Sequence, residues 1–297
     1  AYTVLMPKIP ISNGYFAALF KSPNLINEFR KNSQGMTSDT WNLKYPQIET
    51  IKVCIPALSE QTRVADMLGT LERRIAKQAQ LVENLKKYKR GLLSREFGQQ
   101  ENGNLSNRYV GKLKDYFHLS SGSTPSSTNR AFYSGNIRWV SSGELKPKYL
   151  CETSHHISSE AVSSCNLREY PANTLLIAMY GLEAAGVRGT ASILSVPATI
   201  SQACMAIQQA GEIDIEYLYY WYIYNGQWIG IRIAQGTKQQ NLSTDTLGSL
   251  RIYAPSYSNQ KKVCKLLSQI DYLIEKESKK IDLISSIKRG LLQQLFI

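Results

Sequence analysis

The chain has 297 residues, a formal net charge of +12 and 43% hydrophobic residues. This length allows two domains with cores of their own, and no apolar run reaches the ~20 residues of a membrane-spanning helix. No secretion signal is recognisable, and five cysteines without a C-x-x-C pair argue against a disulfide framework. The sequence therefore predicts a cytoplasmic protein without metal or cofactor, and its basic surplus indicates an anionic partner, most simply nucleic acid.

The first 46 residues are similar to the end of the central part of the chain. Tyr15 aligns with Tyr217 and Asn42 with Asn241, and Ala1 then falls near Ala203. We therefore expect residues 1–46 to be the end of a domain whose beginning is missing. The predicted exposed apolar helix face consists of Phe16, Leu19, Phe20, Leu25, Ile26 and Phe29. A face of this size rarely stays uncovered, which predicts a partner for it.

Residues 43–97 repeat without a gap as residues 242–296, and 14 of the 55 aligned positions are identical. Each copy begins with a short apolar run that ends at Pro56 or Pro255 and predicts a β-strand. A long helix follows in each copy, and its apolar residues recur at steps of three and four, as in a coiled-coil seam. The predicted seam consists of Val64, Leu68, Leu71, Ile75, Val82, Leu85, Val263, Leu267, Ile270, Ile274, Ile281 and Ile284.

The two seams share one polar interruption, because Gln78 and Glu277 occupy the same position in both copies. Such a break can fix the register of a helix pair. We expect the helices to pair antiparallel along 64–92 and 263–295, within one chain or between two. The alternative is that each helix packs separately on a globular core.

A polar segment, residues 98–107, follows the first long helix and predicts a flexible linker. Beyond it, the pattern predicts an α+β domain of about 145 residues. Its β-type runs are Tyr116–Leu119, Ile137–Val140, Thr174–Tyr180, Gly189–Leu194 and Ala203–Ile207. In the next predicted helix, from Ile215 to Tyr224, six consecutive large residues cover every side, which favours burial over base stacking.

The charge surplus lies mainly in the helical repeats. Residues 47–97 carry ten basic against six acidic side chains, and residues 256–297 carry eight against four. Residues 108–255 carry twelve against ten. If the central domain contacts nucleic acid, we expect it to use neutral polar side chains and to depend on partners for affinity.

Several motifs occur in the order found in the specificity subunits of type I restriction-modification systems. The runs Leu119–Ser126 and Ile137–Leu145 resemble the start of a target-recognition domain, and Gly236–Leu242 resembles the family's G-x-x-x-x-N-L loop. Gln260 and the final K-R-G-L-L helix resemble its spacer region. The resemblance implies two recognition domains, each followed by a spacer helix, with the helices antiparallel and each domain reading half of a split DNA target.

The resemblance implies an α+β fold, with a globular α/β target-recognition domain and two long helices that form an antiparallel coiled-coil spacer. The chain departs from the pattern because about 95 residues equivalent to 108–202 have no counterpart before Ala1. The predicted divisions are 1–46, the C-terminal remnant of a first recognition domain; 47–97, the first spacer region; 98–107, the linker; 108–250, the complete recognition domain; and 251–297, the second spacer region.

Three loops carry the side-chain types that read base edges: 123–130, 180–188 and 236–241. Arginine pairs with guanine and asparagine or glutamine with adenine, whereas serine and threonine are adaptable. With neighbouring residues, the predicted DNA-binding set is Ser123, Thr124, Ser126, Arg130, Arg138, Lys146, Tyr180, Arg188, Lys238, Gln239, Gln240 and Asn241. Phosphate contacts are predicted for Lys112, Lys114, Lys146, Lys148 and Lys238. For each loop, the alternative is a purely structural turn.

No catalytic residue is predicted. The chain contains neither the Pro-Pro of a methyltransferase motif nor a Walker A sequence, and its three histidines give no nucleophile–base pair. The resemblance implies a non-catalytic subunit that binds double-stranded DNA and methyltransferase subunits and, through them, the restriction subunit. A self-dimer or a complementing half-domain is predicted for residues 1–46, and no membrane partner. The alternatives are a fused restriction enzyme and a coiled-coil adaptor that has lost DNA binding.

Overall fold

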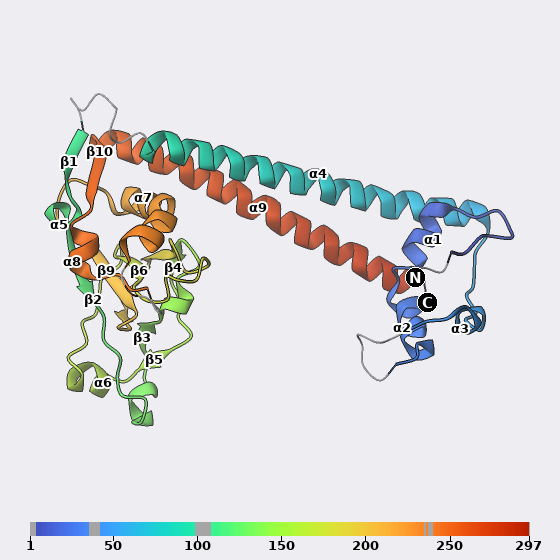
Figure 1. Ribbon diagram of the computed structural model, residues 1–297, viewed down its shortest axis with the longest axis horizontal. Coiled ribbons are helices and arrows are strands. Elements are labelled where there is room, and N and C mark those ends of the chain that lie inside the picture. Colours follow the sequence, from blue (N-terminus) through green and yellow to red (C-terminus); the bar gives the residue numbers. More distant parts are fainter. Residues whose placement is uncertain (1–3, 36–41, 99–107, 235, 237–239, 297) are drawn as a thin grey trace. The chain divides into compact units, whose positions relative to one another are not determined.

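A computed structural model describes residues 4–35, 42–98, 108–234, 236 and 240–296. The chain divides into two compact units (Figure 1): unit 1, residues 1–87 and 271–297, and unit 2, residues 88–270. Two long helices, α4 (Leu58–Phe97) and α9 (Tyr257–Leu295), contribute to both units. No helix in the described part is both long and apolar enough to cross a membrane.

Unit 1 contains three short helices beside its parts of α4 and α9: α1 (Asn13–Leu19), α2 (Pro23–Asn32) and α3 (Tyr45–Glu49). The hydroxyl groups of Ser12 and Ser22 accept hydrogen bonds from the first turns of α1 and α2, which fixes where these helices begin. The core of the unit consists of Tyr15, Leu19, Leu25, Val64, Leu68 and Phe296.

The predicted exposed face of residues 1–46 is wrong for most of its members. Leu19 and Leu25 are buried and Phe16, Ile26 and Phe29 are half-buried, whereas Phe20 is exposed. The reason is that α1 and α2 share one core with the first turns of α4 and the last turns of α9. The prediction of a β-strand before Pro56 is also wrong, because residues 51–55 form no strand.

Within unit 1 the long helices pair antiparallel, as predicted. Near its start, α4 contributes Val64 and Leu68 to a cluster that includes Phe296 at the end of α9. Further along, the Gln78 amide donates a hydrogen bond to the Glu277 carboxylate. All twelve predicted seam residues are buried or half-buried, with their unit 2 members, Val263, Leu267 and Ile270, included. The polar interruption therefore forms a matched layer within one chain.

Unit 2 is built on a five-stranded sheet in the order β2-β9-β6-β7-β4. Its strands are β2 (Phe117–Ser121), β4 (Tyr149–Leu150), β6 (Leu175–Ala178), β7 (Ala191–Leu194) and β9 (Cys204–Gln209). All neighbours run antiparallel except β4 and β7. A three-stranded sheet, β5-β3-β8, consists of β3 (Ile137–Val140), β5 (His156–Ile157) and β8 (Thr199–Ile200).

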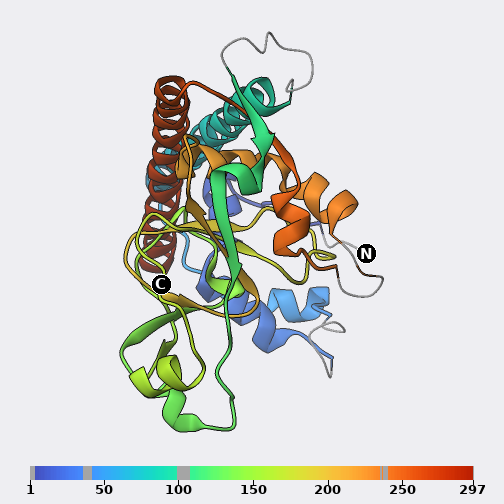
Figure 2. The same cartoon turned by 90° about the vertical axis from the view of Figure 1, so that its left-hand side faces the viewer.

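A third sheet pairs β1 (Arg108–Lys112) with β10 (Arg251–Pro255), the strand just before α9. Figure 2 shows the chain passing from β1 through the short helix α5 (Leu113–Tyr116) into β2 as one nearly continuous path. The remaining elements are α6 (Ser159–Ser164), α7 (Ile215–Trp228), α8 (Thr244–Gly248), two 3-10 turns (Arg130–Tyr133 and Ser142–Glu144) and a π-helical turn (Ile229–Ile233).

The five-stranded sheet is covered on both faces. Along β6, Leu175 and Ile177 join one hydrophobic cluster with α7, whereas Leu176 and Ala178 join another. This alternation is the two-residue period of a strand, and burial of both sets explains why β6 is apolar throughout. Every residue of the aromatic run 217–222 is buried, which confirms the predicted burial. The predicted linker 98–107 lies outside the described residues, except for Gly98.

Candidate nucleic-acid interface

The predicted reading loops meet at one end of the five-stranded sheet. Ser121, the last residue of β2, pairs with Met205, and Ala178, the last residue of β6, pairs with Cys204. The loops that leave β2 and β6 and the turn that enters β9 therefore lie at the same end. The Leu242 backbone N–H donates to the Met179 carbonyl at 2.8 Å, so the end of the loop 236–242 lies there too.

Direct hydrogen bonds join the second and third of these loops. The Leu182 N–H donates to the Gln240 carbonyl at 3.1 Å, and the Gln240 N–H donates to the Glu183 carboxylate at 2.9 Å. This second bond lowers the pKa of Glu183. The Arg188 guanidinium forms hydrogen bonds within its own loop. Nε donates to the Leu182 carbonyl and Nη2 to the Glu183 carbonyl. Arg188 therefore shapes the loop that presents Tyr180.

The loop after β2 is held against the turn 200–202. The Ser123 N–H donates to the Ile200 carbonyl at 3.1 Å, and the Thr124 hydroxyl accepts from the Gln202 N–H at 3.2 Å. The Ser126 hydroxyl lies 2.8 Å from the Thr128 hydroxyl. The loop is therefore ordered by its own polar contacts, while the side chains of Ser123, Thr124, Ser126 and Arg130 remain exposed.

The other predicted DNA-binding residues differ in their solvent exposure. Lys146 and Tyr180 are exposed, and Gln240 is half-buried. Arg138 and Asn241 are also half-buried, and Nε of Arg138 and Oδ1 of Asn241 are buried without a described hydrogen-bond partner. Lys238 and Gln239 lie outside the described residues. The interface thus combines exposed hydroxyl groups with a small number of basic side chains.

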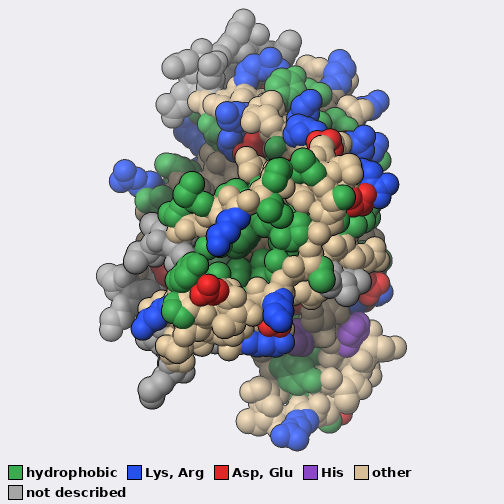
Figure 3. All heavy atoms as spheres, turned by 90° about the vertical axis from the view of Figure 1, so that its right-hand side faces the viewer, with side chains coloured by type: hydrophobic (Ala, Val, Ile, Leu, Met, Phe, Trp, Pro, Cys, Tyr) green, Lys and Arg blue, Asp and Glu red, His purple; other side chains and the backbone are tan. Residues whose placement is uncertain are grey.

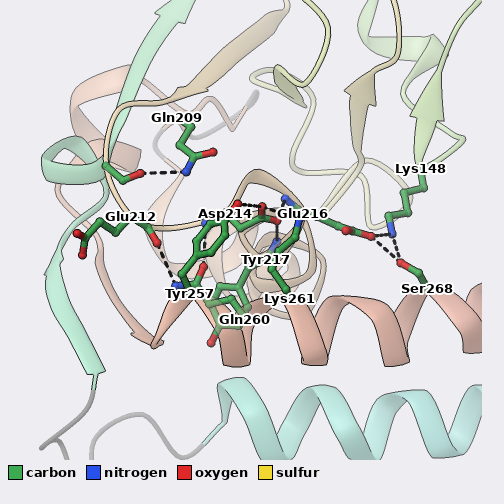
Figure 4. Close-up of polar contacts among 11 residues, drawn as sticks. Lys148, Gln209, Glu212, Asp214, Glu216, Tyr217, Tyr257, Gln260, Lys261 and Ser268 are labelled. Carbon is green, nitrogen blue, oxygen red and sulfur yellow. Dashed lines mark hydrogen bonds and ion pairs between the residues drawn. The ribbon is translucent and has the colours of Figure 1, made fainter.

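Lys148 does not serve as a phosphate contact, contrary to the prediction. Its ammonium group forms an ion pair with Glu216 on α7, and the two side chains are only 14% and 19% exposed. The ammonium group also donates to the Ser268 hydroxyl on α9 at 2.6 Å and to the Tyr220 hydroxyl at 2.9 Å. Figure 4 shows Lys148 and Ser268 converging on Glu216 beside α9. This buried cluster connects the residue before β4 with α7 and α9 within unit 2.

A second polar cluster in the same view is centred on Gln260, which is fully buried. Its carbonyl accepts from the Asp214 backbone N–H at 2.8 Å, and its amide donates to the carbonyls of Pro255 and Glu212. Asp214 caps the first turn of α7 and forms an ion pair with Lys261 at 3.0 Å. Gln260 therefore fixes the start of α7 on the start of α9.

The repeated glutamine makes the same kind of joint in unit 1. The Gln61 carbonyl accepts from the backbone N–H of Ser12, the residue that caps α1, and its amide donates to the Pro56 carbonyl. The helix ends match as well, since Phe97 packs on Tyr217 in unit 2 and Phe296 on Tyr15 in unit 1, each with ring centroids 5.1 Å apart. The identity of Gln61 and Gln260 was visible in the sequence, but their role was not.

One group of potential metal ligands occurs among the described residues: Asp214, Glu216 and Cys264. Both carboxylates already form ion pairs, with Lys261 and Lys148, and burial raises the pKa of the Cys264 thiol. A protonated thiol and two neutralised carboxylates form a poor cation site. The cluster is better explained as a structural joint.

The architecture defines a class of protein: a mixed α/β domain with polar loops at one sheet end, attached to an antiparallel pair of long helices. Residues 107–286 match the model of the family described as type I restriction modification DNA specificity domain. The match covers more than half of the chain, so the chain belongs to this family of specificity subunits.

A curated relative, the type I restriction enzyme MjaIX specificity subunit of Methanocaldococcus jannaschii, is 28% identical over 207 residues. The alignment covers 68% of this chain and 47% of the relative, so the chain spans about half of that protein's length.

Two solved structures share the fold. The type I restriction-modification S subunit from M. genitalium has a TM-score of 0.63 at 17% identity, covering 96% of this chain and 72% of that one. The HsdS subunit from Thermoanaerobacter tengcongensis has a TM-score of 0.58 at 14% identity, covering 95% and 69%.

Proposed function

We propose that the chain is a non-catalytic, sequence-specific DNA-recognition subunit. Residues 108–250 act as the recognition domain, and residues 47–97 and 251–297 act as spacers that position methyltransferase subunits, and through them a restriction subunit, on double-stranded DNA in the cytoplasm. The observation that carries the proposal is the meeting of three polar loops at one end of the sheet in a member of this family. Hydroxyl and amide side chains suit base readout, and Lys146 and Arg130 suit phosphate or guanine contacts.

Cells that carry this chain and its methyltransferase subunit are expected to methylate one DNA motif, which methylome sequencing identifies. Replacing Gln239 with alanine should relax discrimination at one base pair of that motif by ~1–3 kcal/mol, because an amide can pair with adenine through two hydrogen bonds. Replacing Lys238 with alanine should weaken binding to all sequences alike and reduce the salt-dependence slope by about one. Fluorescence anisotropy on the motif and on random duplexes measures both effects.

A matched control is Lys279→Ala, which removes an exposed lysine of α9 that pairs with Glu275 in unit 1. This variant should bind both duplexes like the wild type. If Gln239→Ala instead lost equal affinity for the motif and for random DNA, direct reading by this loop would be excluded. Cleavage of DNA by the chain alone with Mg²⁺ would favour the fused restriction enzyme. Absence of any DNA binding would favour the coiled-coil adaptor.

Unit 1 also exposes apolar side chains whose counterparts in unit 2 are covered. Val53 is 41% exposed, whereas its repeat partner Ile252 lies in β10 beside β1 and is fully buried. Leu5 is 45% exposed, whereas the aligned Ile207 lies in β9 between β2 and β6 and is 2% exposed. Figure 3, in which unit 1 faces the viewer, shows hydrophobic side chains gathered on this face. We infer that a second copy of the chain or a complementing half-domain covers it.

At micromolar concentration the chain is expected to sediment as a dimer or larger species. Exposed apolar surface of this extent favours association at ~1.5–3 kcal/mol for each large side chain that it buries. The double variant Leu5→Glu/Val53→Glu should shift the chain toward a monomer, because it places two carboxylates in the contact. Analytical ultracentrifugation measures the change.

The control for this experiment is Leu283→Glu, which adds one charge at an exposed apolar position of α9 in the same unit. It should leave the sedimentation coefficient unchanged. A wild-type chain that remains a monomer, with residues 1–46 resistant to protease and no added fragment, contradicts the inference.

A further inference from the structure

The space that Lys148 fills in unit 2 has a counterpart in unit 1. The ammonium group of Lys148 contacts Glu216 and Ser268. It also lies over the rings of Tyr219 and Tyr220, 5.6 and 4.5 Å from their centroids. These four contact residues belong to α7 and α9. Unit 1 contains the helices that match these two, so the corresponding position can be located there.

The two glutamine joints define how the units correspond. Gln61 bonds to the residue that caps α1, just as Gln260 bonds to the residue that caps α7. The shift is 202 residues from Ser12 to Asp214, and 199 residues from Gln61 to Gln260. With these shifts, the four residues around the Lys148 ammonium group correspond to Gly14, Ala17, Ala18 and Gly69. Each is therefore replaced by a glycine or an alanine.

The four small residues line a single pocket of unit 1, which we call the α1 pocket. Its other lining residues are Lys21, Ala65, Leu68, Glu72, Lys288 and Leu292. The pocket has a volume of about 110 Å³, many times the ~10–15 Å³ that one water molecule needs. It therefore has room for a large side chain, as the matching space in unit 2 has for Lys148.

The lining of the α1 pocket favours an apolar side chain. Ala18, Ala65, Leu68 and Leu292 contribute side chains without polar atoms. An apolar group that enters such a lining is removed from water together with the surface that it covers, and this burial is favourable. The Lys148 site of unit 2 has a different chemistry, because it offers a carboxylate and two hydroxyl groups.

A lysine in the α1 pocket would lack the ion pair that Lys148 makes. Gly14 occupies the position at which Glu216 supplies the carboxylate. A Cβ added to Gly14 would lie 2.9 Å from the Ala65 Cβ, so no acidic side chain fits there unless the helices move apart. A buried ammonium group without its carboxylate is strongly unfavourable.

The charged residues of the α1 pocket also disfavour a cation. Glu72 is the one carboxylate among the lining residues, and it already pairs with Lys288 at 2.6 Å. Lys21 is a further cation of the lining. An entering ammonium group would therefore meet two like charges and an acid that already has a partner, whereas an apolar group is indifferent to them.

We propose that the α1 pocket binds a large apolar side chain of a complementing half-domain, at the position that Lys148 has in unit 2, and that it excludes lysine. The proposal rests on the inferred covering of unit 1 and selects one of its two candidate partners. A second copy of the chain offers a lysine at this position, and that lysine is already buried against Glu216 in its own unit. The two units thus select different half-domains.

NMR spectra of the full chain, isotope-labelled at its alanine methyl groups, test the chemistry of the pocket with two probes. Toluene represents an apolar side chain, and butylammonium at neutral pH represents the end of a lysine. Toluene is expected to shift the methyl signals of Ala17, Ala18 and Ala65 saturably, whereas butylammonium leaves them unchanged. Ala18→Leu fills the pocket and should abolish the response of the other two alanines.

Ala17→Leu is a second filling variant, at an exposed position, and should also abolish the response. The matched control is Ala76→Leu, which adds the same side chain at an exposed position of α4 outside the pocket and should keep the toluene response. Circular dichroism checks that all three variants are folded. Absence of a toluene shift, an equal shift with butylammonium, or a response that persists in both filling variants would overturn the proposal.

Sedimentation velocity tests the choice of partner. Ala18→Leu should have the sedimentation coefficient of the wild type, because a second copy leaves the pocket empty. A smaller coefficient for Ala18→Leu than for Ala76→Leu would show that a copy of the chain enters the pocket, and would overturn the choice of a half-domain. Failure of the chain to bind DNA would contradict the proposed recognition function alone, since none of these measurements involves DNA.

Discussion

Replacing Lys148 with methionine is expected to lower the free energy of unfolding by about 3–5 kcal/mol, because it leaves the Glu216 carboxylate without its cation in a mostly buried site. Ser268 and Tyr220 also lose the ammonium group to which they are hydrogen-bonded. The double variant Lys148→Met/Glu216→Gln should recover much of the loss, since the uncompensated charge is then gone. Urea denaturation followed by circular dichroism measures all three proteins.

The same pair gives a pH dependence with a defined sign. Burial raises the pKa of Glu216, whereas hydrogen bonds from Lys148 and Ser268 lower it by a larger amount. The pKa of Glu216 is therefore below its ordinary value of 4.5. A carboxyl group with a lowered folded-state pKa stabilises the fold above its unfolded-state pKa, and this stabilisation is lost as the pH falls through the folded-state value. The difference between wild type and Lys148→Met should therefore shrink below pH 4.5. A difference that stays constant down to pH 2 would contradict the ion-pair explanation.

Replacing Gln260 with leucine is expected to cost about 3 kcal/mol, because leucine fills the site but leaves the Asp214 N–H and two carbonyl groups unpaired. Gln61→Leu should cost less, about 2 kcal/mol, since Gln61 makes two such bonds rather than three. Chemical denaturation of both variants provides the comparison.

The control is Gln269→Leu, an exposed position nine residues further along the same helix. It should change the free energy of unfolding by less than about 0.5 kcal/mol. If Gln260→Leu had an equally small effect, the joint would not hold α7 on α9.

The long helices and their pairing could be predicted because a seam at steps of three and four repeats over many turns, and a pattern of that length outweighs local preferences. The burial of the aromatic run of α7 could also be predicted, because six consecutive large residues cover every side of a helix and are unfavourable in water. Residues 1–46 were harder to predict. Their apolar helix face is covered by Val64, Leu68 and Phe296, which lie far away in the sequence. Periodicity alone does not identify such neighbours.

In the candidate site, too, some features could be predicted from the sequence and others could not. Composition selected the loops around Ser123, Tyr180 and Asn241, and the strand register brings them to one end of the sheet. Lys148 looked like any other lysine of that region, because nothing in its sequence neighbourhood indicates Glu216, 68 residues further on. Arg188 likewise resembled a base-reading arginine, although its guanidinium is bonded to carbonyl groups of its own loop.

The glutamine joint limits which changes of sequence the domain can tolerate. Gln260 holds α7 through main-chain atoms only: the nitrogen of Asp214 and the carbonyl oxygens of Glu212 and Pro255. Main-chain atoms are the same in every sequence, so the joint places little restriction on the side chains of the domain that it holds. A domain of different composition can occupy this position if its backbone reaches the same two groups before the helix and its side chains keep partners for Lys261 and Ser268. On the proposed function, the loops that read DNA can therefore differ in sequence while the main-chain contacts of Gln260 stay the same.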